Sequence, residues 1–412
     1  MQEYLSLERV SARVEAMKIS PTIAMSVRAA ELKAAGHDII SLALGELDFN
    51  TPDEIIEAAH SAAINGMTRY TAPDGTPALK KAVCQKFKRD NDLSFNLNQI
   101  HVASGCKQVI YNALAATLDP GDEVVIFSPY WVSYADVIEF CGGKVVVVQT
   151  RPEDGFIPDP GQLAQALTGR TRWVLLNSPN NPTGAVYTAG RMRQMADVIK
   201  PHPGILVMAD EIYEHLTFDD CGHVSFLRVA QEMEGRVLTV NGVSKSYAMT
   251  GWRIGYAAGP TWLISAMAKV QSQTAGNSCS VAQAAAEQAL NGDQGLIQMW
   301  RATLQGRRDR ALHILAGSRL MTAYAAQGSF YSFCDVRRCI GAATPNHKVL
   351  RSDGDVADYL LEVAGVATVA GEAFGTSPFL RISFAVELDR LEEACHRIVR
   401  ALGDLNLGGA CA

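Results

Sequence analysis

The sequence lacks the features that mark proteins of membranes and nucleic acids. No hydrophobic run is long: runs such as VVIF at 124–127 and VVVV at 145–148 have the length of a strand, so we expect no segment that spans a bilayer. Basic residues are not in excess, because 37 Lys and Arg stand against 43 Asp and Glu and give a net charge of −6. This balance, without a basic block, argues against a nucleic acid or an anionic membrane as a partner.

Cysteine and histidine are present, but in no pattern that binds a metal or builds a disulfide framework. The 9 cysteines are scattered, odd in number and without a C-x-x-C pair, and none of the 9 histidines forms H-x-x-H or H-x-x-x-H. GGK at 142–144 lacks the rest of a phosphate-binding P-loop. The first residues, MQEYLSLERVSARVEAMK, contain no apolar stretch of the signal-peptide type. We therefore expect no metal site, reduced thiols and a cytoplasmic protein.

From about residue 98 the chain repeats one rhythm of a short β-rich run, a turn and a helical stretch. Runs that are apolar throughout are typical of strands buried on both faces. The pattern predicts an α/β fold, in which a mostly parallel central sheet carries helices on both faces. The runs that fit such strands lie at 100–104, 123–127, 144–148, 171–176, 204–210 and 236–240.

The rhythm changes after residue 295. A long charged helical segment, MWRATLQGRRDRALHILAG at 299–317, is followed by strand-like segments and a last helix. We expect residues 46–295 to form a large domain and residues 296–412 a smaller α+β domain. The first 45 residues, 1–45, are expected to pack with the small domain or to reach a partner chain.

Residues suited to chemistry stand where the predicted strands end, which is where open α/β sheets bind ligands. The turn at 105–107 follows the first strand and opens a helix, Trp131 follows the second, and the amide-rich loop NSPNNPTG at 177–184 follows the fourth. Asp210 ends the fifth strand and Lys245 follows the sixth. Taken singly, each has an ordinary interpretation, since a Trp there is often core and an Asp can cap the next helix.

Taken together, these residues match the parts of one ligand. A partly desolvated Lys245 can act as nucleophile and base through a Schiff base. Arg253 and the backbone N–H groups at 105–107 suit a phosphate. Asp210 would face a protonated ring nitrogen, and Trp131 would face the flat ring. An aldehyde, a pyridine nitrogen and a phosphate occur together in pyridoxal 5′-phosphate (PLP).

Longer motifs carry this hypothesis further. With them the chain resembles the class I aminotransferases of the fold-type I PLP superfamily, and most closely their bacterial aspartate aminotransferase branch. The resemblance runs from about residue 8 to about residue 400. The motifs are RYTAPDGTPALKKAV at 69–83, DPGDEVVIFSPYWVSY at 119–134, NSPNNPTGAVY at 177–187, ADEIYEHL at 209–216, SKSYAMTGWRIGYAAGP at 244–260 and LRISFA at 380–385.

The resemblance implies a role for each matching position around the cofactor. Lys245 matches the lysine that bonds to the cofactor aldehyde and moves the proton, and Asp210 matches the aspartate on the pyridine nitrogen. Tyr213 and Asn181 match the pair that hydrogen-bonds the ring's 3′-oxygen, and Trp131 matches the aromatic residue stacked on the ring. The implied phosphate cradle consists of Gly105, Cys106, Lys107 and Arg253, with Tyr70 from the neighbouring subunit.

The resemblance also implies a substrate site and a dimer. Arg381 matches the arginine that holds the substrate α-carboxylate with two parallel hydrogen bonds. Lys107 either meets the distal carboxylate of aspartate or glutamate or only supports the phosphate. Tyr70 acting across an interface implies a homodimer with two shared active sites. The implied substrate site consists of Gly45, Lys107, Trp131, Asn181 and Arg381.

The family fold hosts several reactions, so three functions stay open. The first is an aminotransferase that passes the amino group of aspartate or glutamate to a 2-oxo acid by a ping-pong mechanism. The second is an aminotransferase for prephenate, an aromatic compound or a specialised-pathway substrate. The third is a PLP-dependent oxidase, lyase or decarboxylase. A PLP-dependent regulator has the least support, because no room for a DNA-binding domain exists before residue 45.

Four positions depart from the family pattern. Leu47 and Ala370 stand where proline is usual, and Ser278 and Cys279 occupy another region where proline is usual. We expect these departures to lie near the substrate mouth and to bear on specificity or reaction type.

Overall fold

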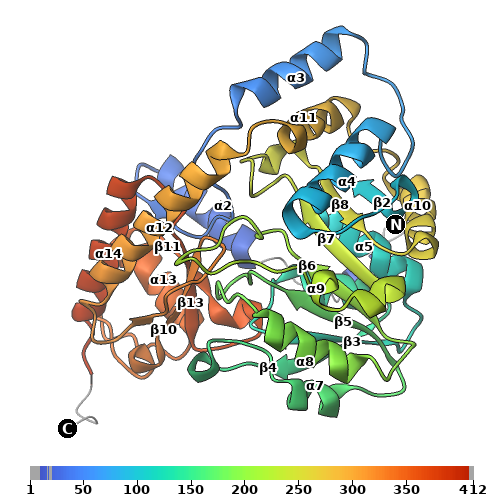
Figure 1. The fold of residues 1–412 in the computed structure, drawn as a ribbon. Helices are drawn as coiled ribbons and strands as arrows, with labels where there is room; N and C mark the ends of the chain where they lie inside the picture. The colour runs from blue at the N-terminus through green and yellow to red at the C-terminus, as the bar shows by residue number, and fades with distance from the viewer. Residues whose placement is uncertain (1–9, 16, 18–20, 408–412) are drawn as a thin grey trace, which may run out of the picture.

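Figure 1 shows a computed structural model of the chain, which describes residues 10–15, 17 and 21–407. A large sheet with its helices forms one side of the molecule, and a smaller sheet with α12, α13 and α14 forms the other. Part of the predicted 1–45 arm lies outside the described residues. Within those residues, every helix is too short or too polar to pass through a lipid bilayer.

The large sheet has 7 strands in the order β2-β8-β7-β6-β5-β3-β4. The neighbours from β4 through β7 pair in parallel, whereas β8 pairs antiparallel with both β7 and β2. The reversal of β8 follows from its connection, because the loop 243–254 contains no crossover helix. The strands are β2 Ile100–Ala103, β3 Glu123–Ser128, β4 Lys144–Gln149, β5 Thr171–Asn177, β6 Leu206–Asp210, β7 Val237–Gly242 and β8 Gly255–Ala258.

Helices cover both faces of this sheet, because successive strand residues point to opposite sides. Val124 and Ile126 of β3 pack in one apolar layer with residues of α5, α6 and α10. Val125 and Phe127 of the same strand pack in the other layer with residues of α4, α8 and α11. The predicted α/β architecture is thus confirmed. The helices of this body are α3 Asp53–Ile64, α4 Pro77–Asn91, α5 Cys106–Thr117, α6 Ser133–Phe140, α7 Pro160–Ala166, α8 Ala189–Ile199, α9 Phe226–Val229, α10 Thr261–Thr274 and α11 Ser280–Asn291.

β4 is the exception to the buried strands. It lies at the edge of the sheet, and of its residues only Val148 is buried. An apolar run can therefore belong to an edge strand as well as to a central one, and the sequence pattern does not separate the two.

The second sheet is antiparallel and has 4 strands in the order β12-β13-β10-β9. A separate parallel pair joins β1 to β11, so the chain before residue 45 attaches to this smaller body. The domain boundaries predicted from sequence stay a prediction. The remaining elements are α1 Ala12–Glu15, α2 Pro21–Ala34, β1 Ile40–Ser41, α12 Gly295–Leu315, β9 Thr322–Ala323, β10 Tyr331–Asp335, α13 Asp353–Ala364, β11 Val366–Ala367, β12 Val369–Ala370, β13 Phe379–Ser383 and α14 Leu388–Gly403.

Candidate active site

A cavity of about 570 Å³ opens at the carboxyl end of the parallel strands and is lined from both bodies. β6 contributes Asp210 at its last residue, and β13 of the smaller sheet contributes Arg381. The turn after β7 contributes Lys245. The predicted site residues that line the cavity are Gly45, Cys106, Lys107, Trp131, Asn181, Asp210, Tyr213, Lys245, Arg253 and Arg381.

Gly105 and Arg253 form a corner of the cavity that suits an anion. Gly105 stands at the start of α5 with φ +87°, and a Cβ there would come within 2.3 Å of the Arg253 guanidinium. Arg253 itself has a positive φ of 56° and donates through Nη1 to the carbonyl of Thr250 at 2.9 Å. The first N–H groups of a helix and a guanidinium together attract a phosphate. Only a residue without a side chain leaves room for both.

Cys106 lies beside this corner without a chemical task of its own. Its thiol donates to the backbone carbonyl of Asn241 at 3.0 Å. Burial raises the pKa of the Cys106 thiol, followed by the charge of Asp210. The side chain therefore stays a neutral thiol and not the nucleophilic thiolate.

Asp210 is buried and has no cation bonded to it. It keeps 3% of its surface, and its Oδ2 accepts a hydrogen bond from the hydroxyl of Tyr134 at 2.6 Å. Burial raises the pKa of Asp210 to about 6, although the bond from Tyr134 partly offsets this. The cationic partner that a buried carboxylate calls for is not supplied by any described residue at ion-pair distance, so a ligand with a positive charge fits there.

Lys245 points into the cavity beneath the strand ends. Its Nζ donates to the carbonyl of Gly45 at 2.6 Å and lies 5.8 Å from the ring of Tyr213 and 5.6 Å from that of Phe330. No ion pair joins it to a carboxylate of the described residues. An amine with apolar rings on one side and no counter-ion is suited to react as a nucleophile.

Arg381 is a buried guanidinium that also lacks a carboxylate. It is 2% exposed, donates to Asn181 Oδ1 at 3.2 Å and to the carbonyl of Ala43 at 2.6 Å, and lies 4.3 Å from the ring of Tyr331. Its Nε has no hydrogen-bond partner. A buried, unsatisfied donor at a cavity wall calls for an anionic acceptor brought by a ligand.

Lys107 and Trp131 stand together at the exposed mouth of the cavity. The ammonium of Lys107 lies 5.2 Å from the Trp131 ring. The indole also meets Tyr134 edge-on, with ring centroids 5.3 Å apart. This contact holds one indole face toward α6 and leaves Lys107 at the cavity rim.

Tyr70 does not reach the cavity of its own chain. Tyr70 is 98% exposed and is not part of the cavity lining, whereas Cys106, Lys107 and Arg253 of the predicted cradle line the cavity and Gly105 directly precedes Cys106. A large aromatic side chain in full contact with water is unusual in a lone chain and fits a residue that serves a neighbouring molecule.

Two tyrosines of the cavity were not among the predicted site residues. Tyr134 bonds Asp210, and Tyr331 places its hydroxyl 3.3 Å from that of Tyr213. Tyr134 belongs to the motif SPYWVSY, and Tyr331 follows GSF in a predicted strand, so both stood in segments that were already noted. Nothing in the local pattern says which of several aromatic residues turns inward.

The four departures from the family pattern do not border the cavity of the single chain. Leu47, Ser278, Cys279 and Ala370 are all absent from its lining. Ser278 is 2% exposed, Cys279 is exposed, and Leu47 and Ala370 pack against the core of the smaller body. Their bearing on specificity stays a prediction, and Leu47 directly follows Gly45 and Glu46, which do line the cavity.

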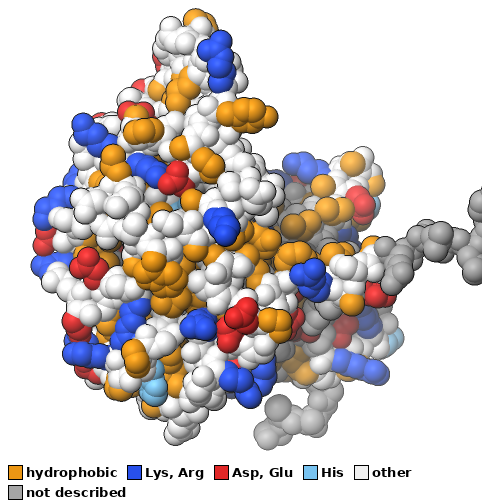
Figure 2. All heavy atoms as spheres, turned by 90° about the vertical axis from the view of Figure 1, so that its right-hand side faces the viewer, with side chains coloured by type: hydrophobic (Ala, Val, Ile, Leu, Met, Phe, Trp, Pro, Cys, Tyr) orange, Lys and Arg blue, Asp and Glu red, His pale blue; other side chains and the backbone are white. Residues whose placement is uncertain are grey.

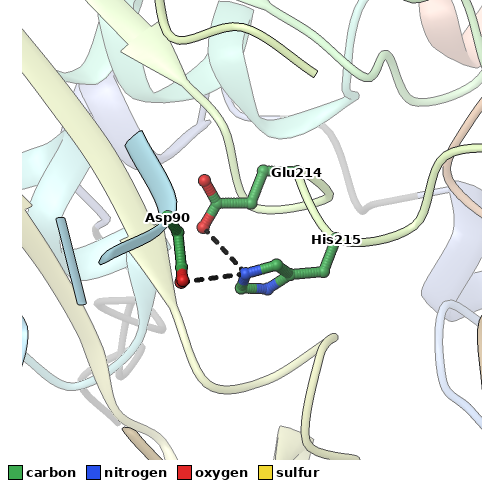
Figure 3. A group of neighbouring side chains, drawn as sticks. All are labelled: Asp90, Glu214 and His215. Atoms are coloured by element: carbon green, nitrogen blue, oxygen red, sulfur yellow. Dashed lines mark hydrogen bonds and ion pairs between the residues drawn. The ribbon is translucent and has the colours of Figure 1, made fainter. Parts of the chain in front are cut away.

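Carboxylates and histidines that the sequence keeps apart do meet elsewhere in the fold. Asp90, Glu214 and His215 point toward one another, as Figure 3 shows. Lys86 forms an ion pair with Glu214, and Arg89 donates to Asp90 at 2.6 Å. These carboxylates therefore already have cationic partners from the chain, and we assign no metal to them.

Comparisons with known proteins agree with this geometry. The family model described as aminotransferase class I and II matches residues 37–398. The aspartate/prephenate aminotransferase of Cereibacter sphaeroides is 48% identical over 382 residues, which is 93% of this chain and 96% of that protein. The probable aspartate/prephenate aminotransferase of Rickettsia bellii is 46% identical over 396 residues, 96% of this chain and 99% of the relative.

Solved structures show the same fold. The crystal structure of the aspartate aminotransferase from Rhizobium meliloti superposes with a TM-score of 0.93 at 44% identity, over 97% of this chain and 100% of the other. The aspartate aminotransferase from Thermus thermophilus with maleate gives a TM-score of 0.89 at 41% identity, over 96% of this chain and 100% of the other. The family match over residues 37–398 and the near full-length similarity to these relatives show that the chain belongs to the class I and II aminotransferases and is an aminotransferase.

Proposed function

We propose that this aminotransferase carries the amino group of a dicarboxylic L-amino acid, aspartate or glutamate, to a 2-oxo acid with PLP as its cofactor. One observation carries the proposal. Lys107, Lys245, Arg253 and Arg381 all stand at one cavity, and none of them makes an ion pair with a described carboxylate. A buried or half-buried cation without a counter-ion, as Arg381 and Lys245 are, calls for an anionic ligand, and the exposed Lys107 and Arg253 add positive charge to the same cavity. A phosphate and the two carboxylates of an amino acid supply those charges.

The residues present fit PLP. The start of α5 at Gly105, together with the guanidinium of Arg253 that lies against it, would hold the phosphate. Asp210, without a cation of its own, would hold the protonated pyridine nitrogen. When bound, PLP supplies an aldehyde that bonds to an amino group and a ring that accepts the electrons of the broken Cα–H bond.

The substrate carboxylates are held by the two outer cations. Arg381 offers two parallel N–H donors to the α-carboxylate, and Asn181, which it contacts, adds a side-chain amide. Lys107 at the mouth would meet the distal carboxylate. Two fixed ends orient the amino acid, so the Cα–H bond presents itself to one base.

Lys245 is the residue that would move the proton. Its ammonium is held only by the Gly45 carbonyl, so the side chain is free to leave that acceptor when a substrate enters. Once its amine is released, it takes the proton from Cα and returns it on the neighbouring carbon. Tyr213, whose hydroxyl is 3.3 Å from that of Tyr331, supplies a hydroxyl that donates to the cofactor oxygen.

We also propose that the enzyme is a homodimer and works in the cytoplasm. Tyr70, 98% exposed, would complete the phosphate corner of the other subunit. Apolar side chains gather on the face shown in Figure 2, and α3, which stands at the top of Figure 1, exposes Ile56 and Ile64 at 45% and 72%. Such apolar surface fits a subunit contact. Free thiols at all the described cysteines fit a reducing compartment.

A second candidate substrate is prephenate, which the names of the Cereibacter sphaeroides and Rickettsia bellii relatives give beside aspartate. Apolar side chains of Ile23, Leu44 and Val132 line the cavity together with Trp131. These side chains would receive the ring of a larger substrate while Lys107 keeps the distal carboxylate.

The test is a spectral titration of the purified holoenzyme with single amino acids, without a 2-oxo acid, in air and again without oxygen. We expect aspartate or glutamate to convert the visible band of the aldehyde form to the shorter-wavelength band of the amine form in both gases. Prephenate should then restore the first band if it is an acceptor. Oxygen uptake without the amine form would instead indicate an oxidase, and consumption of the amino acid with neither the amine form nor oxygen uptake would indicate a lyase.

A further inference from the structure

A chain of hydrogen bonds beside the cavity joins three segments that are distant in sequence. His215 Nδ1 lies 2.9 Å from Ser246 Oγ, and His215 Nε2 lies 3.1 Å from Asp90 Oδ2. Asp90 lies near the end of α4, His215 in the turn after β6, and Ser246 directly after Lys245. None of the three lines the cavity, and the reaction uses none of them directly.

The protonation of this chain follows from the donors and acceptors. A carboxylate only accepts, so His215 Nε2 must donate its N–H to Asp90. With a neutral ring, Nδ1 then accepts the hydroxyl proton of Ser246, and with a charged ring Nδ1–H donates to the same oxygen. Ser246 is 1% exposed, so its hydroxyl lies away from bulk solvent. The ring is therefore held at both nitrogens in either state.

Charged groups surround the imidazole ring of His215 on the side away from Ser246. Figure 3 shows the ring beside two of them, Asp90 and Glu214. Glu214 Oε1 lies 3.7 Å from His215 Nε2 and pairs with Lys86, whose side chain has no exposed surface. Lys86 also donates to Asn91 Oδ1 at 2.7 Å. This paired, buried network gives the imidazole a rigid support. The titratable groups that face or adjoin it are Lys86, Arg89, Asp90, Glu214 and Tyr247.

Lys245 needs such a support, because it lies in a turn without regular secondary structure. Beyond backbone bonds, the segment is held by Thr51 to the carbonyl of Ala248 at 2.7 Å and by Tyr247 to Gln294 at 2.7 Å. These contacts connect the lysine segment to Thr51, in the first part of the chain, and to Gln294, which directly precedes α12. The bond from Ser246 to His215 leads instead to the turn that carries Tyr213 and directly follows Asp210 at the end of β6.

We propose that His215 is a positioning residue for Lys245. Through Ser246 it ties the lysine segment to the turn that carries Tyr213 and follows Asp210, and Asp90 fixes the orientation of its ring. The inference rests on the proposed function, since it assigns to Lys245 the proton transfer. Loss of the tie lets the Lys245 backbone drift while the carboxylate sites at Arg381 and Lys107 stay intact. The defect therefore falls on kcat and not on KM.

Two substitutions of one residue separate this role from a merely structural one. In His215→Asn the side-chain amide reaches about as far as Nδ1 and can still meet Ser246, whereas in His215→Gln it reaches about as far as Nε2 and meets Asp90 instead. We expect His215→Gln and Ser246→Ala each to lower kcat of the half-reaction with aspartate by about tenfold, with KM within about twofold. His215→Asn should stay within about threefold of wild type. The double variant of His215→Gln and Ser246→Ala should be no worse than either alone.

A readout on the cofactor-free protein keeps the test independent of turnover. Hydrogen exchange of residues 243–250 should speed up in His215→Gln and Ser246→Ala and stay close to wild type in His215→Asn, while α14 is unchanged in all. In the holoenzyme, the pH midpoint of the visible absorbance should move in the first two variants only. The exposed His60→Gln and Ser272→Ala serve as matched controls and should change none of these quantities.

The inference is overturned if His215→Asn and His215→Gln lose activity equally, if the losses of His215→Gln and Ser246→Ala multiply, or if exchange at 243–250 does not respond. A wild-type enzyme that rejects aspartate and glutamate would contradict the proposed substrate instead. The exchange and absorbance measurements would then still decide the role of His215.

Discussion

Asp210 is the last residue of β6, Glu214 lies in the turn that follows, and both are buried, yet their pKa values move in opposite directions. Burial raises the pKa of Asp210 to about 6. Burial also raises the pKa of Glu214, but the charge of Lys86, followed by those of His215 and His223, outweighs it, and the pKa falls to about 2. The carboxylate that faces the cavity has been left without a cation, and the one behind it has been given several hydrogen-bonded partners. Both carboxylates are buried, so the difference between their pKa shifts comes from the cationic partners of Glu214 and not from the extent of burial.

The lysines and arginines also differ between the cavity and the rest of the interior in whether they have an ion-pair partner. Lys245 and Arg381 face the cavity without a counter-ion from the described part of the chain, whereas Lys86 pairs with Glu214 and the buried Arg308 pairs with Asp219 at 2.6 Å. The fold thus contains matched pairs of the same residue type, one reserved for a ligand and one used for stability. Each pair can be tested with parallel substitutions.

The largest contrast is expected between the two lysines. Lys245→Ala should lower turnover by at least about 10⁴-fold and abolish the visible band of bound cofactor, because the nucleophile and base is lost. Its melting temperature should hold, since no ion pair is removed. Lys86→Met should lower the free energy of unfolding by about 3–5 kcal/mol by leaving Glu214 unpaired. Turnover retained in Lys245→Ala would refute the assignment of the catalytic lysine.

The next largest difference is expected between substitutions of Asp210 and of Glu214. Asp210→Asn should lower turnover by about 10³-fold, because an amide does not hold the proton on the ring nitrogen, and should leave stability at pH 7 equal or higher. Glu214→Gln should lower turnover by less than about tenfold and unfolding free energy by about 3 kcal/mol. Turnover assays and denaturant unfolding of both variants check this. A reversed pattern would place the functional carboxylate at Glu214.

The arginines give a smaller effect. Arg381→Lys should weaken kcat/KM by about 10²-fold for every amino acid alike, because a point charge does not replace the two parallel donors. Arg308→Lys, which touches Asp219 away from the cavity, should leave kcat/KM unchanged and cost about 1 kcal/mol of stability. A loss in Arg381→Lys confined to one amino acid would show that this residue reads the side chain instead of the α-carboxylate.

Lys107 sharpens the comparison within the cavity itself. Lys107→Ala should lower kcat/KM for aspartate and glutamate by about 10–100-fold and for alanine and phenylalanine by less than about threefold. Steady-state kinetics with the four amino acids measures this. Equal losses for all four, together with weaker cofactor binding, would move Lys107 to the phosphate corner.

The smallest effect is a pH dependence of stability in the cofactor-free protein. The folded pKa of Asp210, about 6, lies above its ordinary 3.8, so the folded state binds more protons and its stability falls by about 2–3 kcal/mol as pH rises through that window. Glu214, with a folded pKa of about 2 against an ordinary 4.5, contributes stability above pH 4.5 that is lost as pH falls toward 2. Urea unfolding between pH 3 and pH 7 measures this dependence. In Asp210→Asn the fall in stability with rising pH should disappear, whereas it should persist in variants that keep Asp210.

Much of the site could be predicted from short segments because its residues follow strand ends. Asp210, Lys245 and the turn at 105–107 were identified by their place after apolar runs, and the parallel sheet brings those ends to one cavity. Tyr134 and Tyr331 were missed, since an aromatic residue near a strand end is equally consistent with the core. The four departures do not line the cavity, and nothing local says on which side of a loop a residue lies.

The linear order of the chain was enough for the alternation of strands and helices, the nucleophile, the anion turn and the family motifs, because each of these depends on neighbours within a few residues. It was not enough for the relation between Asp90, Glu214 and His215, for the absence of counter-ions at Lys245 and Arg381, or for the opposite behaviour of two nearby carboxylates. These depend on distances between segments far apart in the chain. Burial makes the electrostatic consequences of those distances large, and burial exists only once the segments have packed.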